Sequence, residues 1–544
     1  MNIKNAFLTT LLGLFVFSFS AVAQKTSSKK QTDIKKQTEV KNELAPPVPV
    51  ATPISSETKP KIDVKNIGRT PGNYSIKVKI NGLKNVSLFL ADNFGDKQYM
   101  RDTCQLDNNG VGVFSGNPKL QRGLYMIVFP EMNAYFELPI TEDQDFSFEG
   151  DTSVDETKIK IIGSTENAAF VEYQIHRVAY GKQKYDLENQ YKNAKATKNN
   201  EMMAQLKPQI EILEKQDMDF RNGYIAKYPQ HLLTKIFKAF EPVLFPKDVV
   251  LDSMQQYYFY RTHFWDNFDL SETGLIRAPG GLLIRKLNEY IDRVSFQDFD
   301  SLIVSVDDAI GKTLENTETQ KYFVQHLTAK FQDKKIMCMD NVTYHIINKY
   351  YCTGKAWWYD DTAGMRKMCE ESKKAIPTYC GKTAPNLKLA DTSGNYKTLY
   401  ENMGKVTILF FYDPTCGHCK EVMPVVAKVH DKLSKYGVKV YAVSTENKYD
   451  EWRAMMRKNP DMKNFINVCK TDRYYPWPIY KNDYNITVNP TLFVLDENGR
   501  ILGKKIDEHQ LEYFIESILY EKKIINYKPE LPKEKPAKKD EKEG

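Results

Sequence analysis

The sequence predicts a multidomain fold: a small antiparallel β domain, an all-α central domain and a C-terminal α/β domain. In residues 62–163 apolar side chains alternate with polar ones, which is typical of strands, and in residues 164–375 they recur at helical spacing. In residues 376–527 strand and helix patterns alternate, which indicates an α/β layer fold. With 544 residues, 41% of them hydrophobic, the chain can form several packed cores.

Residues 1–23 have the pattern of a secretory signal peptide. One cation, Lys4, precedes an apolar run over residues 6–19, and Ala-Val-Ala at 21–23 supplies a cleavage site. An uncleaved anchor helix is the alternative, but the run is shorter than the ~20 residues that span a bilayer. We therefore expect cleavage after Ala23, export, and no membrane-spanning segment in the mature chain.

Two segments outside the predicted domains are rich in charge and proline. Residues 24–61 contain eight Lys and four acidic residues, and residues 528–544 contain six Lys and five acidic residues. Neither segment can bury enough apolar area to offset chain entropy, so we predict a disordered linker and a disordered charged tail. Without these segments and Lys4 the net charge falls from +7 to +1. Nucleic-acid binding needs a dense cationic face, which the folded part lacks, so nucleic-acid binding is not expected.

The β domain is predicted from short alternating runs separated by turns. The first run extends from Tyr74 to Ile80. Further runs lie at 86–91, 110–116, 124–130, 134–140 and 146–150. The segment contains no histidine and one cysteine, Cys104, so no chemistry is expected there.

The helical domain is predicted from apolar faces. One face comprises Leu206, Ile210, Leu213, Phe220 and Tyr224. An earlier helix carries Phe170, Tyr173 and Val178, Pro208 is expected to begin or kink the next helix, and aromatic-rich helices are expected at 257–268 and 341–351. His263, His326 and His345 occur singly, so each is expected to be an ordinary packed or surface histidine, and no metal site is predicted.

The C-terminal domain contains the informative motif. Its predicted strands are 406–412, 438–444, 464–468 and 491–496, and its predicted helices are 416–435, 449–458 and 508–521. Cys416 and Cys419 therefore lie where the first strand gives way to a helix, at a spacing that allows a reversible disulfide. The helix dipole and unpaired N–H groups favour an anion at Cys416, and such sites lower a thiol pKa from ~8.5 to about 3.5–7.5.

Two alternatives explain this pair less well. A zinc site needs a second pair of ligands, and the chain has no other Cys-x-x-Cys or Cys-x-x-His. A structural disulfide would close too short a loop to stabilise the fold much. The strand–cysteine pair–helix context therefore predicts redox chemistry, in which Cys416 attacks a disulfide and Cys419 resolves the mixed disulfide.

Residues 376–527 resemble the thioredoxin superfamily, and most of all the exported TlpA/ResA-like thiol–disulfide oxidoreductases. The matching elements are Gly381 to Pro385 with Asp391 and Gly394, then Cys416-Gly417-His418-Cys419, Pro424, and Tyr484 to Asp496 with Gly499. The order of the three domains also resembles a group of secreted thioredoxin-like proteins of Gram-negative bacteria.

The resemblance implies a substrate-binding surface beside the cysteines. By that resemblance Pro490 is cis and packs against the disulfide, and the backbone of Asn489 pairs with an extended substrate. Thr415 and Thr491 are expected to contribute to the same surface. The resemblance further implies a periplasmic location, exported protein substrates with disulfides, a membrane electron donor, and no cofactor besides the Cys416–Cys419 disulfide.

The chain departs from this family at the proton acceptor for the second thiol. Thioredoxins carry a buried Asp where this chain has Phe410, and ResA-like proteins carry a Glu where it has Val422. Glu421 is adjacent to position 422, but a shift of one position along a helix rotates the side chain by about 100° about the helix axis, so Glu421 does not occupy the same place. The sequence therefore does not identify the residue that accepts the proton of Cys419.

His418 between the cysteines resembles the motif of disulfide isomerases. When charged, it would stabilise the Cys416 thiolate and make the disulfide more oxidising, although a simply solvent-exposed histidine is the alternative. The leading expectation is a periplasmic reductase. A disulfide isomerase or oxidase is one alternative, and a partner-binding scaffold with an auxiliary redox domain is another.

The remaining cysteines and one aromatic cluster allow weaker expectations. Cys338–Cys352 and Cys369–Cys380 could be structural bridges, with buried thiols as the alternative, because spacing does not fix connectivity. Cys469 could lie near the active end of the domain or be an ordinary buried thiol. A final cluster, expected to pack or else to face substrate, comprises Tyr474, Tyr475, Trp477 and Tyr480.

Overall fold

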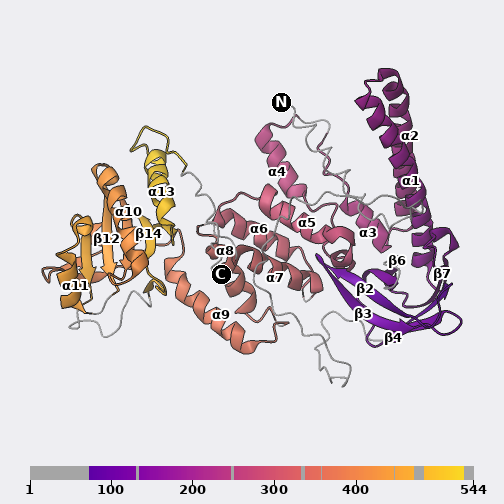
Figure 1. Cartoon of the computed structure of the whole chain (residues 1–544), viewed down its shortest axis with the longest axis horizontal. Helices are drawn as coiled ribbons and strands as arrows, with labels where there is room; N and C mark the ends of the chain where they lie inside the picture. The colour runs from indigo at the N-terminus through magenta and orange to yellow at the C-terminus, as the bar shows by residue number, and fades with distance from the viewer. Residues whose placement is uncertain are drawn as a thin grey trace, which may run out of the picture. The chain divides into compact units, whose positions relative to one another are not determined.

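The computed structural model (Figure 1) describes residues 73–129, 134–246, 250–315, 317–332, 337–356, 358–445, 448–470 and 483–531. The predicted signal peptide, the 24–61 linker, the tail beyond residue 531 and the aromatic cluster at 474–480 lie outside these residues. The described chain divides into two compact units, one ending at Ile210 and the other beginning at Glu211, and residues 93–97 belong to the second. Among the described residues, no helix combines the length and apolarity needed to cross a membrane.

The first unit contains two four-stranded sheets, ordered β4-β1-β7-β8 and β3-β2-β5-β6. The strands are β1 Tyr74–Asn81, β2 Ser87–Phe94, β3 Lys97–Gln105, β4 Val111–Gly116, β5 Gly123–Phe129, β6 Ala134–Ile140, β7 Asp145–Asp151 and β8 Lys160–Ile162. The predicted alternation in β1 is confirmed, since Ile76, Val78 and Ile80 are fully buried. The domain is not wholly antiparallel, because β1 pairs with β7 in parallel. The unpredicted strands β3 and β8 are edge strands, which bury few side chains and therefore lack an apolar pattern.

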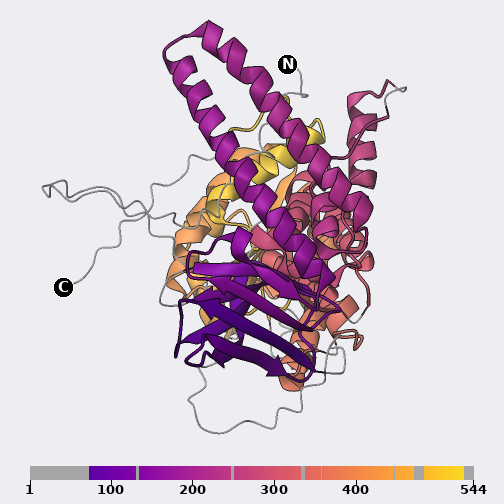
Figure 2. The same ribbon diagram turned by 90° about the vertical axis from the view of Figure 1, so that its right-hand side faces the viewer.

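Two long helices, α1 (Thr165–Ala196) and α2 (Asn200–Lys227), follow the sheets as an antiparallel pair (Figure 2). Phe170 and Tyr173 are buried as predicted. Val178 is 50% exposed, so its predicted place on the apolar face is wrong: the buried residues near the start of α1 end at Gln174. Pro208 lies inside α2 and does not begin it.

The second unit begins with the helical region. Its helices are α3 Leu232–Ala239, α4 Ser253–His263, α5 Leu282–Glu289, α6 Phe299–Gly311, α7 Glu318–Gln332, α8 Asp340–Ile346 and α9 Thr362–Ala375. The three single histidines each bond a protein side chain: His263 to Asp266 at 2.6 Å, His326 to Asn288 at 3.0 Å and His345 to Asp307 at 2.9 Å. These contacts fit the ordinary structural roles expected from the sequence.

A seven-stranded sheet forms the rest of the second unit, ordered β10-β9-β13-β12-β11-β14-β15. Its elements are β9 Lys388–Asp391, β10 Tyr396–Thr398, β11 Val406–Tyr412, α10 Gly417–Leu433, β12 Val438–Ser444, α11 Tyr449–Met456, β13 Ile466–Cys469, β14 Thr491–Asp496, β15 Ile501–Lys504 and α13 Glu508–Glu521. β11 is parallel to β12 and antiparallel to β14. Every residue of β11 is buried, because α10 and α13 contribute to the core on one face and Tyr484 and Ile486 to the core on the other.

Within the described ranges the cysteines form two disulfides, Cys338–Cys380 and Cys352–Cys369. The predicted pairs, Cys338–Cys352 and Cys369–Cys380, are therefore wrong, although the same four cysteines are used. The reason is strand β15, which spacing along the chain does not reveal. The disulfide sulfur of Cys338 lies 3.8 Å from the carbonyl oxygen of Leu502, and the N–H of Gly381 donates to the carbonyl of Ile501 at 2.8 Å.

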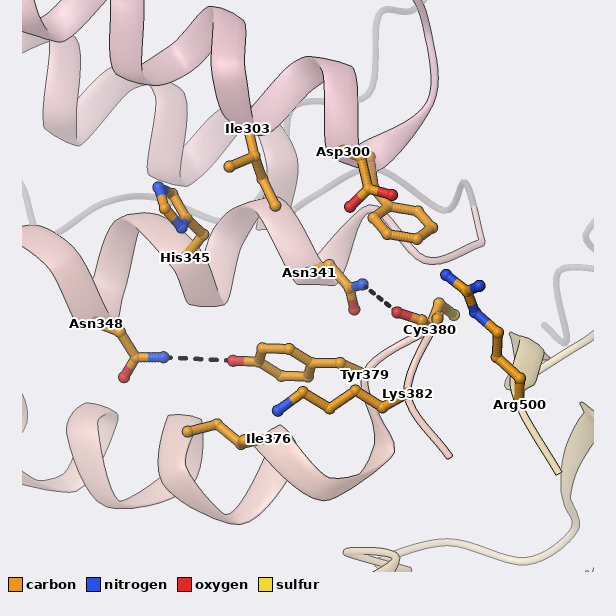
Figure 3. Close-up of a pocket in the computed structure, with 12 residues that line it drawn as sticks. Asp300, Ile303, Asn341, His345, Asn348, Ile376, Tyr379, Cys380, Lys382 and Arg500 are labelled. Carbon is orange, nitrogen blue, oxygen red and sulfur yellow. Dashed lines mark hydrogen bonds between the residues drawn. The ribbon is translucent and has the colours of Figure 1, made fainter. Parts of the chain in front are cut away.

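A pocket of about 460 Å³ lies beside the Cys338–Cys380 disulfide (Figure 3). Asn341 of α8 donates to the carbonyl of Cys380 at 3.1 Å, and Asn348 and Arg500 contribute to the lining. Next to it, Asp340 forms a 2.8 Å ion pair with Lys504 of β15. The disulfide and this ion pair together fasten α8 to the edge of the seven-stranded sheet.

Candidate active site at the cysteine pair

The turn between β11 and α10 is built by Asp413. Its Oδ1 accepts the backbone N–H of Thr415 at 2.7 Å and the Thr415 hydroxyl at 2.6 Å, and its carbonyl accepts the N–H of Cys416 at 3.1 Å. This is the local hydrogen bonding that Asp side chains favour at turns. Cys416 is the N-cap residue of α10, with φ −70° and ψ 128°, so its sulfur lies where the helix presents unpaired N–H groups.

The two sulfurs of the pair occupy different environments. Both thiols are free, Cys416 is partly exposed, and Cys419 is completely buried in the core cluster formed by α10 and the sheet. The backbone N–H of Asp413 donates to the Sγ of Cys419 at 3.4 Å. A substrate can therefore reach Cys416 directly but not Cys419.

The acidities of the two thiols diverge for the same reason. Hydrogen bonding from the backbone of Cys419, assisted by the Cys419 thiol and the backbone of His418, lowers the pKa of Cys416 from its ordinary value. Burial raises the pKa of Cys419 to about 12. Of the two thiols, the accessible one therefore loses its proton more readily, as a nucleophile requires.

The loop before β14 faces the first cysteine. The Asn489–Pro490 bond is cis, and the thiol of Cys416 lies 3.9 Å from the carbonyl oxygen of Asn489. The side-chain Nδ2 of Asn489 donates to the Thr445 hydroxyl at 2.8 Å, and the N–H of Thr445 donates to the carbonyl of Tyr412 at 2.8 Å. The structure thus brings together Cys416 and Asn489, which lie 73 residues apart in the sequence.

The other predicted site residues differ in exposure. Thr415 is exposed beside Cys416, whereas Thr491 is buried and its hydroxyl donates to the carbonyl of Val488 at 2.7 Å. His418 has a half-exposed side chain, and its Nδ1 lies 3.4 Å from Oε2 of Glu421. The carboxylate of Glu421 points into solvent, with 80% of its side chain exposed.

Sequence reasoning missed two contributors to the site. Thr445 connects the Asn489 loop to the end of β11, and a signal existed, because Thr445 directly follows β12 and neighbouring parallel strands end at the same edge. Trp452 of α11 donates to the hydroxyl of the buried Tyr412 at 2.8 Å, and no local sequence pattern predicts this contact. Cys469 is completely buried, and it pairs in register with Ser444 at this same end of the sheet.

This strand, cysteine pair, helix and cis-proline loop define a thioredoxin-like domain of the thiol–disulfide oxidoreductase class. Residues 404–501 match the family model described as thioredoxin-like, and the C-terminal domain belongs to that family, as the motifs predicted. Residues 183–374 match a second family model, a domain of unknown function, DUF5106.

Among similar proteins are named members of this class. The thiol-disulfide oxidoreductase ResA of Bacillus cereus is 29% identical over 146 residues, which cover 25% of this chain and 78% of ResA. The thioredoxin-like protein YneN of Bacillus subtilis is 28% identical over 134 residues, covering 24% of this chain and 73% of YneN. A solved domain of a "possible thiol-disulfide isomerase" from Cytophaga hutchinsonii is 36% identical and covers 27% of this chain and 95% of that chain, with a TM-score of 0.24.

Proposed function

We propose that this chain is an exported, periplasmic thiol–disulfide oxidoreductase that reduces disulfides in exported proteins through Cys416 and Cys419. The contrast between the two sulfurs carries the proposal: an accessible thiol with a lowered pKa stands three residues before a buried one with a raised pKa. The signal-peptide pattern at residues 1–23 and the similarity to ResA support the location and the reaction class.

In this reaction the Cys416 thiolate attacks one sulfur of the substrate disulfide, and the other substrate sulfur leaves as a thiolate that takes up a proton. Cys419 then attacks the Sγ of Cys416, which releases the second substrate thiol and closes the Cys416–Cys419 disulfide. Two electrons pass from the protein to the substrate. The carbonyl of Asn489, directed at Cys416, is placed to accept a backbone N–H of an extended substrate.

The oxidised protein must be reduced again after each turnover. We propose that a membrane electron donor does so by the same exchange in reverse, with no cofactor besides the cysteine pair. Exposed Thr415 and buried Thr491, the first residue of β14, would shape the surface on which both partners bind.

The half-exposed His418 favours a second candidate, a disulfide isomerase or oxidase. A charged histidine beside the nucleophile raises the reduction potential. Potentials of about −180 mV characterise isomerases, whereas that of thioredoxin is about −270 mV. Equilibrating Cys416–Cys419 with glutathione of known potential separates the two: a value close to the thioredoxin one supports the reductase.

The proposal is tested by trapping. In the Cys419→Ser variant the mixed disulfide on Cys416 cannot resolve, so exported substrates accumulate as covalent adducts that mass spectrometry identifies. Cys416→Ser should abolish both adduct formation and turnover of insulin disulfides. Full turnover by Cys416→Ser would disprove the proposal.

A further inference from the structure

If the proposed function holds, Cys419 must lose a proton when it attacks the mixed disulfide, and its acceptor has to be found in this chain. Both positions at which related proteins carry an acid are apolar here: Phe410 and Val422 are completely buried in the same core cluster as Cys419. Water does not reach the sulfur, since Cys419 has no exposed surface. The acceptor must therefore be a neighbouring side chain.

The titratable neighbours from the sheet cannot serve. Tyr412 of β11 accepts a hydrogen bond from Trp452 and donates its hydroxyl proton to the sulfur of Met456 at 3.3 Å. Burial raises the pKa of Tyr412 above its ordinary value, so the phenol stays protonated and cannot take a second proton at neutral pH. Cys469 of β13 is itself a buried thiol with no basic site to offer.

The titratable neighbours on α10 are also unsuited. Cys416 is the other member of the disulfide and is consumed in the step. His418 and Glu421 lie on the exposed side of the helix, 3.4 Å from each other, with side chains 54% and 80% exposed. Cys419 points the opposite way, into the core.

The geometry points to Asp413, and we propose that its carboxylate is the proton acceptor for Cys419. Its backbone N–H already donates to the Cys419 sulfur at 3.4 Å, so the residue lies against the thiol. Its side chain is fixed by the two hydrogen bonds from Thr415 and is only partly buried, which leaves the carboxylate in contact with solvent for proton exchange. The charge of Asp413 also opposes ionisation of both cysteines, although hydrogen bonding from the Cys419 backbone outweighs it and lowers the pKa of Cys416, and burial is the larger cause of the raised pKa of Cys419.

The proposed step balances as follows. The Cys419 S–H proton passes to the Asp413 carboxylate as the Cys419 sulfur attacks the Sγ of Cys416. The bond between Cys416 and the substrate sulfur breaks, and the Cys416–Cys419 bond forms. The substrate leaves as a thiolate, which is protonated from solvent, and Asp413 returns its proton to solvent.

The Asp413→Asn variant separates proton acceptance by Asp413 from its role in building the turn between β11 and α10. Asparagine keeps an Oδ1 that can accept the Thr415 N–H, but it cannot take a proton. A matched control is Asp496→Asn. The Oδ1 of Asp496 also accepts two hydrogen bonds, in its case from the backbone N–H groups of Asn498 and Arg500, at the end of β14 remote from Pro490.

Stopped-flow reaction of the reduced protein with 5,5′-dithiobis(2-nitrobenzoate) resolves the two steps, because each releases one equivalent of coloured thiolate. We expect Asp413→Asn to slow the second phase at least tenfold at pH 7, with a rate that then rises with hydroxide concentration, because general-base catalysis typically contributes 10²–10⁴-fold. The first phase should stay within about threefold of the wild type, and Asp496→Asn should change neither phase.

Two results on the second phase would overturn the inference: a second phase in Asp413→Asn within twofold of the wild type from pH 6 to 9, or a comparable slowing in Glu421→Gln. If the wild type itself released no second equivalent, the proposed function would fail instead, so the two failures are distinguishable. A loss of the first phase in Asp413→Asn would show that the residue only builds the turn, and would also count against the inference.

Discussion

Of the two disulfides in the described residues, Cys338–Cys380 should contribute more to the free energy of unfolding than Cys352–Cys369. It joins residues 42 apart, whereas Cys352–Cys369 joins residues 17 apart. In the chain-entropy account the cost of removing a link grows with loop length, which gives about 4 kcal/mol for the first pair and about 3 kcal/mol for the second. Cys338 and Cys380 are also buried in the core of the seven-stranded sheet, so their loss adds a packing penalty.

The test compares two double variants, Cys338→Ala/Cys380→Ala and Cys352→Ala/Cys369→Ala, by urea denaturation with the free energy of unfolding extrapolated to water. The first variant should be the less stable of the two. A loss below about 1 kcal/mol for the first pair, or a larger loss for the second, would refute the reasoning. Mass mapping of the wild type should find the observed pairs and not Cys338–Cys352.

Three further changes have defined expectations. Thr445→Val removes the hydrogen bond that holds Asn489, worth about 1 kcal/mol, so the KM for a peptide disulfide should rise about fivefold while kcat is unchanged. Asp340→Asn leaves the buried Lys504 without its carboxylate and should cost about 3 kcal/mol in thermal denaturation, whereas Lys504→Met should cost less. Burial lowers the pKa of His326 to about 4, so between pH 6.5 and 4 the unfolded state binds more protons and stability falls as the pH falls, by at most about 3 kcal/mol. His326→Gln should remove that part of the pH dependence of the melting temperature, and an unchanged slope would contradict the assignment.

The central strands could be predicted to the residue from the sequence. Strands 406–412, 438–444 and 491–496 are continuous apolar runs because both faces of the sheet are covered, so burial and sequence agree. β15, Ile501–Lys504, escaped prediction because it is a short edge strand that contains Gly503 and a buried Lys504. Cys338 and the residue after Cys380 both contact β15, at Leu502 and Ile501, so a strand that the sequence does not reveal lies where the two cysteines meet.

The sequence predicts only those residues of the site that belong to a motif of consecutive or closely spaced residues. Cys416 and Cys419 could be predicted from their spacing at a strand–helix junction. Pro490 could be predicted from the similarity of its segment to a known motif. Thr445 and Asp413 act through hydrogen bonds to another segment or to a neighbouring sulfur, and a single sequence does not encode such contacts as a pattern. Thr491 follows the motif proline, yet its hydroxyl is buried in a backbone contact.

The account depends most on Cys416 being an anion while Cys419 remains a thiol. Alkylation of the reduced wild-type chain by iodoacetamide, followed by peptide mass mapping across pH 4 to 10, measures both acidities at once. We expect Cys416 to be modified first, with its rate half-maximal at a pH below the ~8.5 of a free thiol, and Cys419 to remain unmodified at pH 7. Faster modification of Cys419, or a midpoint for Cys416 at or above ~8.5, would contradict the account.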